Sequence, residues 1–538
     1  MRPYSASLLL FFALVAVYCI WILSLPLFPS QDGPVHLYYA SILSHLLSGS
    51  RLFSEYFSIR HPVPPYSLHY VLMLLLMKVF SPILVEKCVV CLIIIGFCFG
   101  FRFLVTTISP KHASTVSLLS FPLSLNWAVG MGFHNYCLSL AFSFFAIAFW
   151  LRGVVERKNG YRLAFLVLCG LMLFTHPVPL FMTLAVVAGE LLLRLVNARL
   201  APRRAKAGLL DLVRSERTDL IFALLAFSSI AYIFLFVSGA RTAEGFQHKL
   251  IQGHMLLDLL KLRPLILVWG NIAVRSYRIF LFLLLGFCFW VGVQGLRRHW
   301  RDRHFQSSDV LLIGSLLLGL LYPIIPRSIN GSDYFADRLI IYIWSFAVIG
   351  AAAFVTFRDR HWRAIRFGSC FIAIALLAVY DKEVRAAAHH LERIEASPVS
   401  PHGGRGMFID APMPPADFFL TFDPYIWSSA RYFRKTETVM LNAPWLDLPI
   451  LPVAPMNGLF ANIFPPKINN YPNTLWETLI KSSHARSLIN RELDYIIFIG
   501  FSGKDHDAPD KLLKQNWWRT WKCERDNWYS VCYSPERQ

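Results

Sequence analysis

The chain has 538 residues, of which 56% are hydrophobic and only 16% charged, with a formal net charge of +19. The mean hydropathy is +0.48, and the charged fraction of 16% lies well below the roughly 25% of soluble domains. These values exclude an ordinary soluble domain. The excess of Lys and Arg does not indicate nucleic-acid binding, because the basic residues cluster between apolar runs and no soluble basic domain carries aromatics in a nucleic-acid pattern. Composition predicts a polytopic α-helical membrane protein.

The first apolar run covers residues 5–28 and is interpreted as a retained span, because it is long for a signal peptide and lacks a small-x-small cleavage site. The following turn, residues 28–36, reads Phe-Pro-Ser-Gln-Asp-Gly-Pro-Val-His and contains the first acidic residue, Asp32. A carboxylate held in a kinked turn beside a span lies near the membrane surface, where it can act as a base or a ligand. The alternative is that Asp32 only caps the next helix.

Four clusters of basic residues separate the later apolar runs, at 152–162, 194–217, 297–303 and 358–366. The positive-inside rule places all four clusters in the cytoplasm. With this parity, the predicted spans are 5–28, 84–108, 113–131, 134–151, 161–176, 177–196, 219–238, 278–296, 309–326, 338–357 and 364–380. The N-terminus is then inside and the C-terminus outside. The fold class is a bundle of about 11 to 13 spans.

One apolar stretch, 67–82, is left over, and we expect it to lie on the membrane surface or to re-enter the membrane. A complete extra crossing there would invert all four basic loops. The loop 239–277, placed outside, interleaves basic and apolar residues like an amphipathic helix in the headgroup plane. Either nonspecific attraction to anionic membrane lipids or a dedicated phosphate site would explain its charge.

The predicted topology gathers polar side chains on the outer face, while the centres of the spans stay almost free of charge. That distribution favours a site at the membrane interface, since an ion pathway would place ionisable groups at the midplane. The candidate residues besides Asp32 are His36, His134, Asn135, His176, Arg327, Asp333, Asp337 and Arg338. Plainer interpretations stay open: a His at a helix end is often a cap or anchor, and Arg338 could simply pair with Asp333 or Asp337.

The segment 381–538 differs from the rest, because apolar spans stop and short β-like runs appear at 406–410, 436–441 and 495–500. We therefore predict a transmembrane domain, 1–380, and an extracytoplasmic α/β domain, 381–538. Eight cysteines lie in apolar runs, whereas Cys523 and Cys532 flank a plausible hairpin turn and could form a disulfide in an oxidising compartment. No zinc spacing, Gly-rich phosphate loop or Gly-x-Ser-x-Gly elbow is evident.

The order of these features resembles the glycosyltransferase C superfamily, which includes the protein mannosyltransferases and the bacterial aminoarabinose transferases. The shared features are a first span followed by an Asp in the first outer loop, about a dozen spans, a late outer loop ending in the pair Asp337-Arg338, and a C-terminal outer domain. The short motif around Asp32 is the only local match. Many members carry two adjacent acidic residues where this chain has Gln31-Asp32, so the resemblance leaves the need for a divalent metal open.

The resemblance implies an inverting transferase that moves a sugar from a polyprenyl-phosphate carrier to a glycan, lipid or protein acceptor at the outer face of the membrane, in bacteria the inner membrane. Asp32 would be the base, Arg327 or Arg338 would stabilise the departing phosphate, and His134, Asn135 and His176 would orient sugar or phosphate oxygens. Two alternatives remain: a lipid or solute transporter, and a non-catalytic assembly subunit. The donor sugar is not identified by the sequence.

Overall fold

The computed structural model describes residues 3–60, 63–200, 216–238, 262–268, 272–325 and 334–395, and beyond these 405–410, 430, 434, 439–440, 453–455, 494–499, 522–525 and 529–533. The chain forms two compact units. Unit 1 comprises Met1–Ser24, Cys88–Lys382 and Phe419–Thr421, and unit 2 comprises Leu25–Lys87, Glu383–Phe418 and Phe422–Gln538. The division near 382 falls inside a helix.

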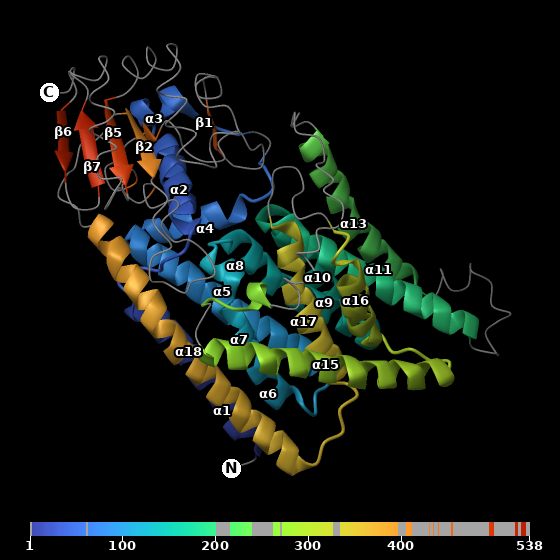
Figure 1. The fold of residues 1–538 in the computed structure, drawn as a ribbon. Helices are drawn as coiled ribbons and strands as arrows, with labels where there is room; N and C mark the ends of the chain where they lie inside the picture. The colour runs from blue at the N-terminus through green and yellow to red at the C-terminus, as the bar shows by residue number, and fades with distance from the viewer. Residues whose placement is uncertain are drawn as a thin grey trace. The chain divides into compact units, whose positions relative to one another are not determined.

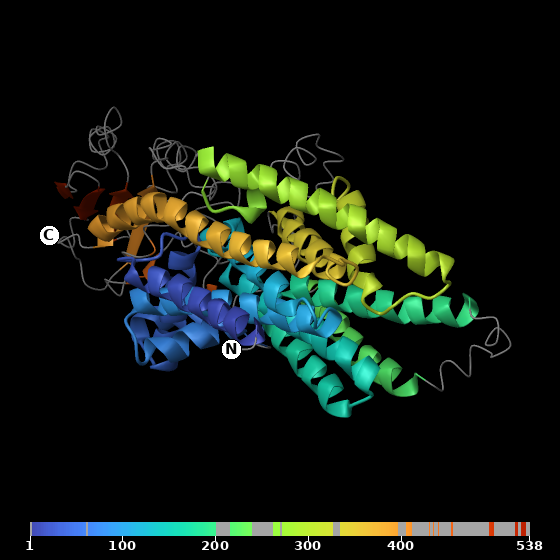
Figure 2. The same ribbon diagram turned by 90° about the horizontal axis from the view of Figure 1, so that it is seen from below.

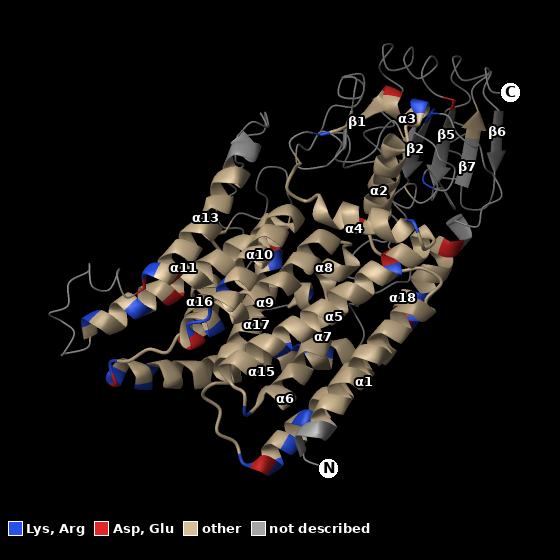
Figure 3. Ribbon diagram, turned by 180° about the vertical axis from the view of Figure 1, so that it is seen from behind, with Lys and Arg blue, Asp and Glu red and all other residues tan. Residues whose placement is uncertain are grey.

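Long apolar helices make up unit 1 (Figure 1): α1 (Pro3–Ser24), α5 (Pro82–Ile108), α9 (His134–Glu156), α10 (Asn159–Thr175), α11 (Pro177–Leu200), α13 (Arg217–Ser238), α15 (Ile272–Arg301), α16 (Asp309–Leu321), α17 (Phe335–Ala351) and α18 (Asp359–Glu395), of which α5 and α18 extend into unit 2. In the described part of the chain, 7 helices are long and apolar enough to cross a membrane. Charged residues gather toward helix ends and leave long uncharged stretches of helix between them (Figure 3). The protein is an integral membrane protein.

The span predicted over 113–131 is not one continuous helix. It is divided into α6 (Ala113–Val116), η1 (Ser117–Leu119), α7 (Ser120–Ser124) and α8 (Trp127–Gly130). The break follows from Asn126, whose side-chain oxygen accepts hydrogen bonds from the backbone N–H groups of Ala128 and Val129 and so begins a new helix. An Asn side chain offers the backbone an alternative to helical hydrogen bonding, which hydropathy does not reveal.

Two basic residues that were interpreted as loop charges, the buried Arg162 and the half-buried Arg194, belong to an ion-pair network. Arg162 Nε lies 2.6 Å from Asp219 Oδ1, and Arg194 lies 2.6 Å from Glu190 and 2.7 Å from Asp219. Glu190 is fully buried and also accepts a hydrogen bond from Ser307 at 2.8 Å. The network joins one end of α10, α11 and α13. Removing one partner would leave a buried charge uncompensated, which is strongly destabilising.

The first and last helices of unit 1 lie side by side (Figures 1 and 2). Tyr18 Oη on α1 donates a 3.0 Å hydrogen bond to the carbonyl of Ala373 on α18, and Trp21 Nε1 donates a 2.7 Å bond to Asp381. Two polar contacts thus hold α1 against α18, although the bonded residues are more than 350 positions apart in the sequence.

Unit 2 combines the segment after the first span with the C-terminal strands. Its elements are α2 (Gly33–Leu47), α3 (Arg51–Tyr56), β1 (Phe57–Ile59), α4 (Leu68–Met77), β2 (Arg405–Asp410), β3 (Val439–Met440), β4 (Val453–Pro455), β5 (Tyr495–Ile499), β6 (Lys522–Arg525) and β7 (Tyr529–Tyr533). Five strands form a sheet of order β3-β2-β5-β7-β6, in which β2 runs parallel to β3 and β5, and β7 antiparallel to β5 and β6. Strands β2, β3 and β5 overlap the predicted β-runs, of which residues 436–438, 441 and 500 lie outside the described residues.

Contacts within unit 2 tie its two sequence segments together. Strands β1 and β4 pair, the Met440 N–H donates a 2.7 Å hydrogen bond to Tyr38 Oη on α2, and Arg405 forms an ion pair of 3.3 Å with Asp494. Cys523 and Cys532 are opposite each other in the β6–β7 pair, and Cys532 is disulfide-bonded. Helix α4, at ten residues, would be only about 15 Å long, half of what a crossing requires.

Candidate functional site

Asp32 lies at the start of α2, in unit 2. It is the N-cap residue, and its backbone carbonyl accepts the N–H groups of Val35 and His36 at 3.1 Å each. Its carboxylate makes no capping hydrogen bond, although the side chain is only 4% exposed. The amide of Gln31 donates to it at 3.4 Å. The capping alternative therefore holds for the backbone of Asp32 and not for its carboxylate.

His36, one helical turn after Asp32, belongs to a buried aromatic cluster with two residues of α4. Its Nδ1 lies 2.9 Å from Tyr70 Oη and 3.5 Å from His69 Nε2. Burial, with a smaller contribution from the Asp32 carboxylate, holds the pKa of Tyr70 well above its ordinary value, so the phenol keeps its proton. A protonated phenol is able to donate to Nδ1, and in that arrangement the proton of a neutral His36 is on Nε2.

The turn before α2 is also held from the start of α5. The Ser30 hydroxyl donates a hydrogen bond to Glu86, which is fully buried, and Lys87 Nζ donates to the carbonyl of Leu25 at 2.8 Å. Sequence reasoning missed Glu86, His69 and Tyr70. The available signals were an acid inside an apolar run, which is expensive unless it has a role, and polar groups at the start of the 67–82 stretch.

Arg338, in unit 1, is buried at the start of α17 and packed against aromatic rings of α9 and the turn before it. Its guanidinium carbon lies 4.3 Å from the centroid of Phe133 and 5.8 Å from that of Tyr136. Tyr136 Oη donates a 2.6 Å hydrogen bond to the backbone carbonyl of Arg338. Cation–π contacts of this kind hold the plane of a guanidinium without using its N–H donors. The sequence indicated Arg338 as a site residue. It did not indicate that Phe133 and Tyr136 support it.

His176 lies in the turn between α10 and α11 and contacts Arg338. Both of its ring nitrogens face N–H groups. Its Nδ1 lies 3.2 Å from the Val178 N–H, and its Nε2 lies 3.3 Å from Arg338 Nη1. Burial, and then the charge of Arg338, hold the pKa of His176 well below its ordinary value, so the imidazole is neutral. A neutral imidazole has one acceptor nitrogen, yet both of its nitrogens face N–H donors. With either tautomer, one N–H group points at another.

The arrangement at His176 has a direct chemical consequence. If Nδ1 accepts from Val178, then Nε2 carries a proton beside the guanidinium of Arg338, and two donors lie next to each other. Two N–H groups this close can both donate to one oxygen of an anion such as phosphate, beside the contacts that they already make. The Arg338–His176 pair is therefore a candidate anion site.

The remaining candidates lie near these two clusters in sequence or outside the described residues. His134 is fully buried at the start of α9, and Asn135 next to it uses its side-chain oxygen to accept the Tyr136 N–H at 2.8 Å. Asp337 is buried beside Arg338 on α17. Arg327 and Asp333, like most of the loop 239–277, lie outside the described residues. Unit 2 therefore holds the Asp32 and His36 cluster, and unit 1 the Arg338 and His176 cluster.

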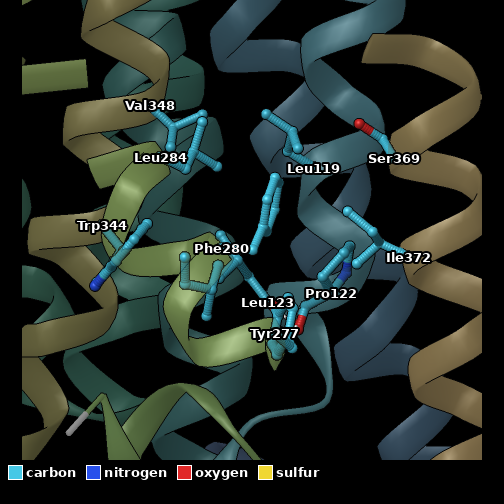
Figure 4. Close-up of a pocket in the computed structure, with 11 residues that line it drawn as sticks. Leu119, Pro122, Leu123, Tyr277, Phe280, Leu284, Trp344, Val348, Ser369 and Ile372 are labelled. Carbon is cyan, nitrogen blue, oxygen red and sulfur yellow. Dashed lines mark hydrogen bonds between the residues drawn. The ribbon is translucent and has the colours of Figure 1, made fainter. Parts of the chain in front are cut away.

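No group of three or more His, Cys, Asp or Glu side chains among the described residues could hold a metal ion. An apolar pocket of unit 1 also lies apart from every predicted site residue (Figure 4). Leu119 and Pro122, Tyr277 and Phe280, Trp344, and Ser369 line it, from η1 and α7, α15, α17 and α18. The ring nitrogen of Trp344 points away from the pocket in the close-up. A lining with so few polar groups supplies no acid, base or charge.

Long apolar helices with buried polar clusters at their ends define a polytopic membrane protein whose polar chemistry lies at the ends of the spans. The chain shares its fold with the apo crystal structure of ArnT from Cupriavidus metallidurans, to which it is similar with a TM-score of 0.53, 12% identity and coverage of 98% of both chains. The predicted resemblance is thereby confirmed for the fold.

A second ArnT structure, bound to undecaprenyl phosphate, is similar with a TM-score of 0.49, 13% identity and coverage of 98% of this chain and 97% of that chain. No protein-family model matches the sequence, and no curated protein matches it significantly.

Proposed function

We propose that the chain is an integral-membrane glycosyltransferase that moves a sugar from a polyprenyl-phosphate carrier to an acceptor nucleophile at the outer membrane surface. The observation that carries this proposal is the Asp32 carboxylate, which is buried at a helix start, makes no capping bond, and follows the first span of a fold shared with a glycosyltransferase. A buried acid beside a cluster of His and Tyr side chains is a candidate for proton transfer.

Asp32 removes the proton of the acceptor as its oxygen or nitrogen attacks the anomeric carbon of the sugar. The new bond forms on the face opposite the lipid phosphate, so the configuration at this carbon inverts. The bond between the anomeric carbon and the phosphate oxygen breaks, and its electron pair leaves with the phosphate. His36 lies one turn from Asp32, and with its Nδ1 held by Tyr70 it presents an Nε2–H group that can orient an acceptor or sugar oxygen.

Negative charge grows on the departing phosphate, and we assign its stabilisation to Arg338 with His176. The support is that Arg338 Nη1 lies 3.3 Å from His176 Nε2 while His176 Nδ1 faces the Val178 N–H, so that both side chains can donate to one anionic oxygen. Because the guanidinium is already stacked on Phe133, little rotational freedom is lost when it binds. His134, Asn135 and Asp337 are assigned to the same region, and Arg327 and Asp333 stay predictions from the sequence.

The direct test is a transfer assay. Purified protein is incubated with radiolabelled polyprenyl-phosphate sugars and membrane extract, and the label is followed from the carrier to a carrier-free product. We expect transfer with wild type and none with the Asp32→Asn variant. Label that crosses vesicle membranes while still attached to its carrier would instead make the protein a transporter. Normal complementation of a deletion strain by the Asn variant would favour an assembly subunit.

The proposed orientation, with the N-terminus in the cytoplasm and the C-terminal segment outside, has its own test. Single cysteines at Ser48 and Asp302, both exposed, are introduced into a background without reactive thiols. Ser30, which also lies in the first outer loop, is unsuitable because it is buried and bonded to Glu86. A membrane-impermeant thiol reagent should label the Ser48 position in intact cells and leave the Asp302 position unlabelled. The reverse pattern would move Asp32 to the cytoplasmic face.

A further inference from the structure

An open apolar groove runs between α9 and α10 of unit 1, away from both polar clusters. Phe142, Phe145 and Phe149 line it from α9, and Gly160, Ala164 and Val167 line it from α10. These spacings of three, four and seven residues place each set on one helix face. Its volume of about 610 Å³ falls in the ~300–1,000 Å³ range of small-molecule sites.

The groove is hollow because two small residues stand where larger side chains would fill it. A methyl group placed on Gly160 would meet no atom within 4 Å, and Val167 on the same face is 56% exposed. In a membrane, such a face needs no protein cover, because lipid tails are as apolar as its side chains. The groove therefore suits a hydrocarbon chain.

Cations lie at the end of the groove where α10 begins. The α9–α10 connection contains Arg157 and Lys158, both exposed, which precede Gly160 by three and two residues. Arg152, near the end of α9, is held by a 3.0 Å bond to Thr107, and Glu156 is paired with Lys158 at 2.8 Å. Three cations against one carboxylate leave net positive charge where the headgroup of a lipid in the groove would lie. The positive charge thus matches the anionic headgroup of a lipid, and the apolar lining matches its acyl chain.

We propose that this groove is a binding site for an anionic glycerophospholipid, with one acyl chain between α9 and α10 and the headgroup phosphate against Arg157 and Lys158. Binding there would hold α9, which begins at His134 and carries Tyr136, against α10, whose last residue precedes His176. The bound lipid is a structural partner of unit 1 and does not take part in sugar transfer.

The test uses phosphatidylglycerol and phosphatidylcholine that carry the same photoreactive diazirine in the acyl chain, followed by mapping of the labelled peptides. We expect phosphatidylglycerol to label α9 and α10 in wild type at lower concentration than phosphatidylcholine. The double variant Arg157→Gln/Lys158→Gln should bind phosphatidylglycerol ~25-fold more weakly, at about fivefold per cation near the headgroups, and should bind phosphatidylcholine as before.

Gly160→Leu fills the groove and should abolish labelling by both lipids. The matched control is Gly170→Leu, on the same helix, where an added side chain also meets no atom within 4 Å but which does not line the groove. Both changes replace glycine in a helix and should not weaken the fold. Equal labelling by the two lipids, or equal loss in the two leucine variants, would overturn the proposal. A wild-type dimer that Gly160→Leu converts to a monomer would assign the groove to a second copy of the chain.

Discussion

The two polar clusters are assembled in different ways. The Asp32 cluster of unit 2 takes its acid and His36 from one turn of sequence, and its supports, Tyr70 and Glu86, come from within 54 residues of Asp32. The Arg338 cluster of unit 1 joins residues separated by 162 and 202 positions. A cluster formed locally shows its reactive group in the sequence, whereas one formed over long range shows only isolated residues. The proposed roles differ in the same way: the proposed base lies in unit 2, and the proposed hydrogen-bond donors to the phosphate lie in unit 1.

The largest effect is expected at the base. Asp32→Asn should lower the rate of sugar transfer by about 100-fold to 10,000-fold, the usual contribution of a positioned base. Because the Asp32 carboxylate makes no capping hydrogen bond and Asn is nearly the same size, thermal stability and carrier binding should be almost unchanged. Rates and melting temperatures measured on the same preparation check this. A loss of stability that parallels the loss of rate would return Asp32 to a structural role.

A smaller effect is expected at the donor cluster. Arg338→Lys keeps the charge but loses the planar fork of N–H donors and its stacking on Phe133, so carrier affinity should fall by about 10-fold to 100-fold, as for loss of a hydrogen bond to a charged group. Carrier binding is measured directly with the unreacted lipid phosphate. The same substitution at Arg327 provides a comparison. Wild-type affinity in the Arg338 variant would assign that residue to packing.

Two substitutions at His176 separate its two nitrogens. Asn can replace Nδ1 as acceptor of the Val178 N–H but does not reach Arg338, whereas the amide of Gln reaches the position of Nε2. His176→Asn should weaken carrier binding about tenfold, in the lower range for one hydrogen bond to a charged partner, and His176→Gln should retain more of it. Titrations of both variants with the carrier check the order. If Asn binds as well as wild type, the Nε2 donor has no part in anion binding.

The lowered pKa of His176 also predicts how stability depends on pH. The unfolded chain takes up a proton at this residue below about pH 6.5, while the native protein resists it, so stability should fall as pH drops below that value. The slope from this one group is at most about 1.4 kcal/mol per pH unit. Denaturation curves between pH 7 and pH 5 measure it, with His176→Asn as the control that should lose this component. An unchanged slope in that variant would mean that other groups titrate.

The smallest effect concerns the support of His36. Tyr70→Phe removes the hydroxyl that lies 2.9 Å from His36 Nδ1, and should destabilise the protein by about 1–3 kcal/mol, because a buried acceptor loses its donor. Transfer should slow only about fivefold, as expected for one neutral hydrogen bond of about 1 kcal/mol. Melting temperature and transfer rate, measured together, rank this site against Asp32. A loss as large as that of Asp32→Asn would make Tyr70 part of the proton-transfer step.

The sequence by itself determined the membrane class, the approximate position of most apolar helices and the places of three strands in the C-terminal segment, and it made Asp32 the leading candidate for the base. These features depend on composition, on the length of apolar runs and on turn chemistry, all of which act over a few residues. The sequence also indicated Arg338 and His176, but only among many polar residues on one predicted face of the membrane. It did not indicate that these two side chains contact each other.

Only the tertiary structure decided which of these residues meet and what each does there. It broke the predicted 113–131 span at Asn126, buried Arg162 in an ion pair, grouped the Asp32 turn with the C-terminal strands in unit 2, and brought His176 against Arg338. The physical reason is that hydropathy records how much apolar surface a segment buries and not against which partner. Hydrogen bonds and ion pairs between distant segments depend on packing, which no local pattern contains.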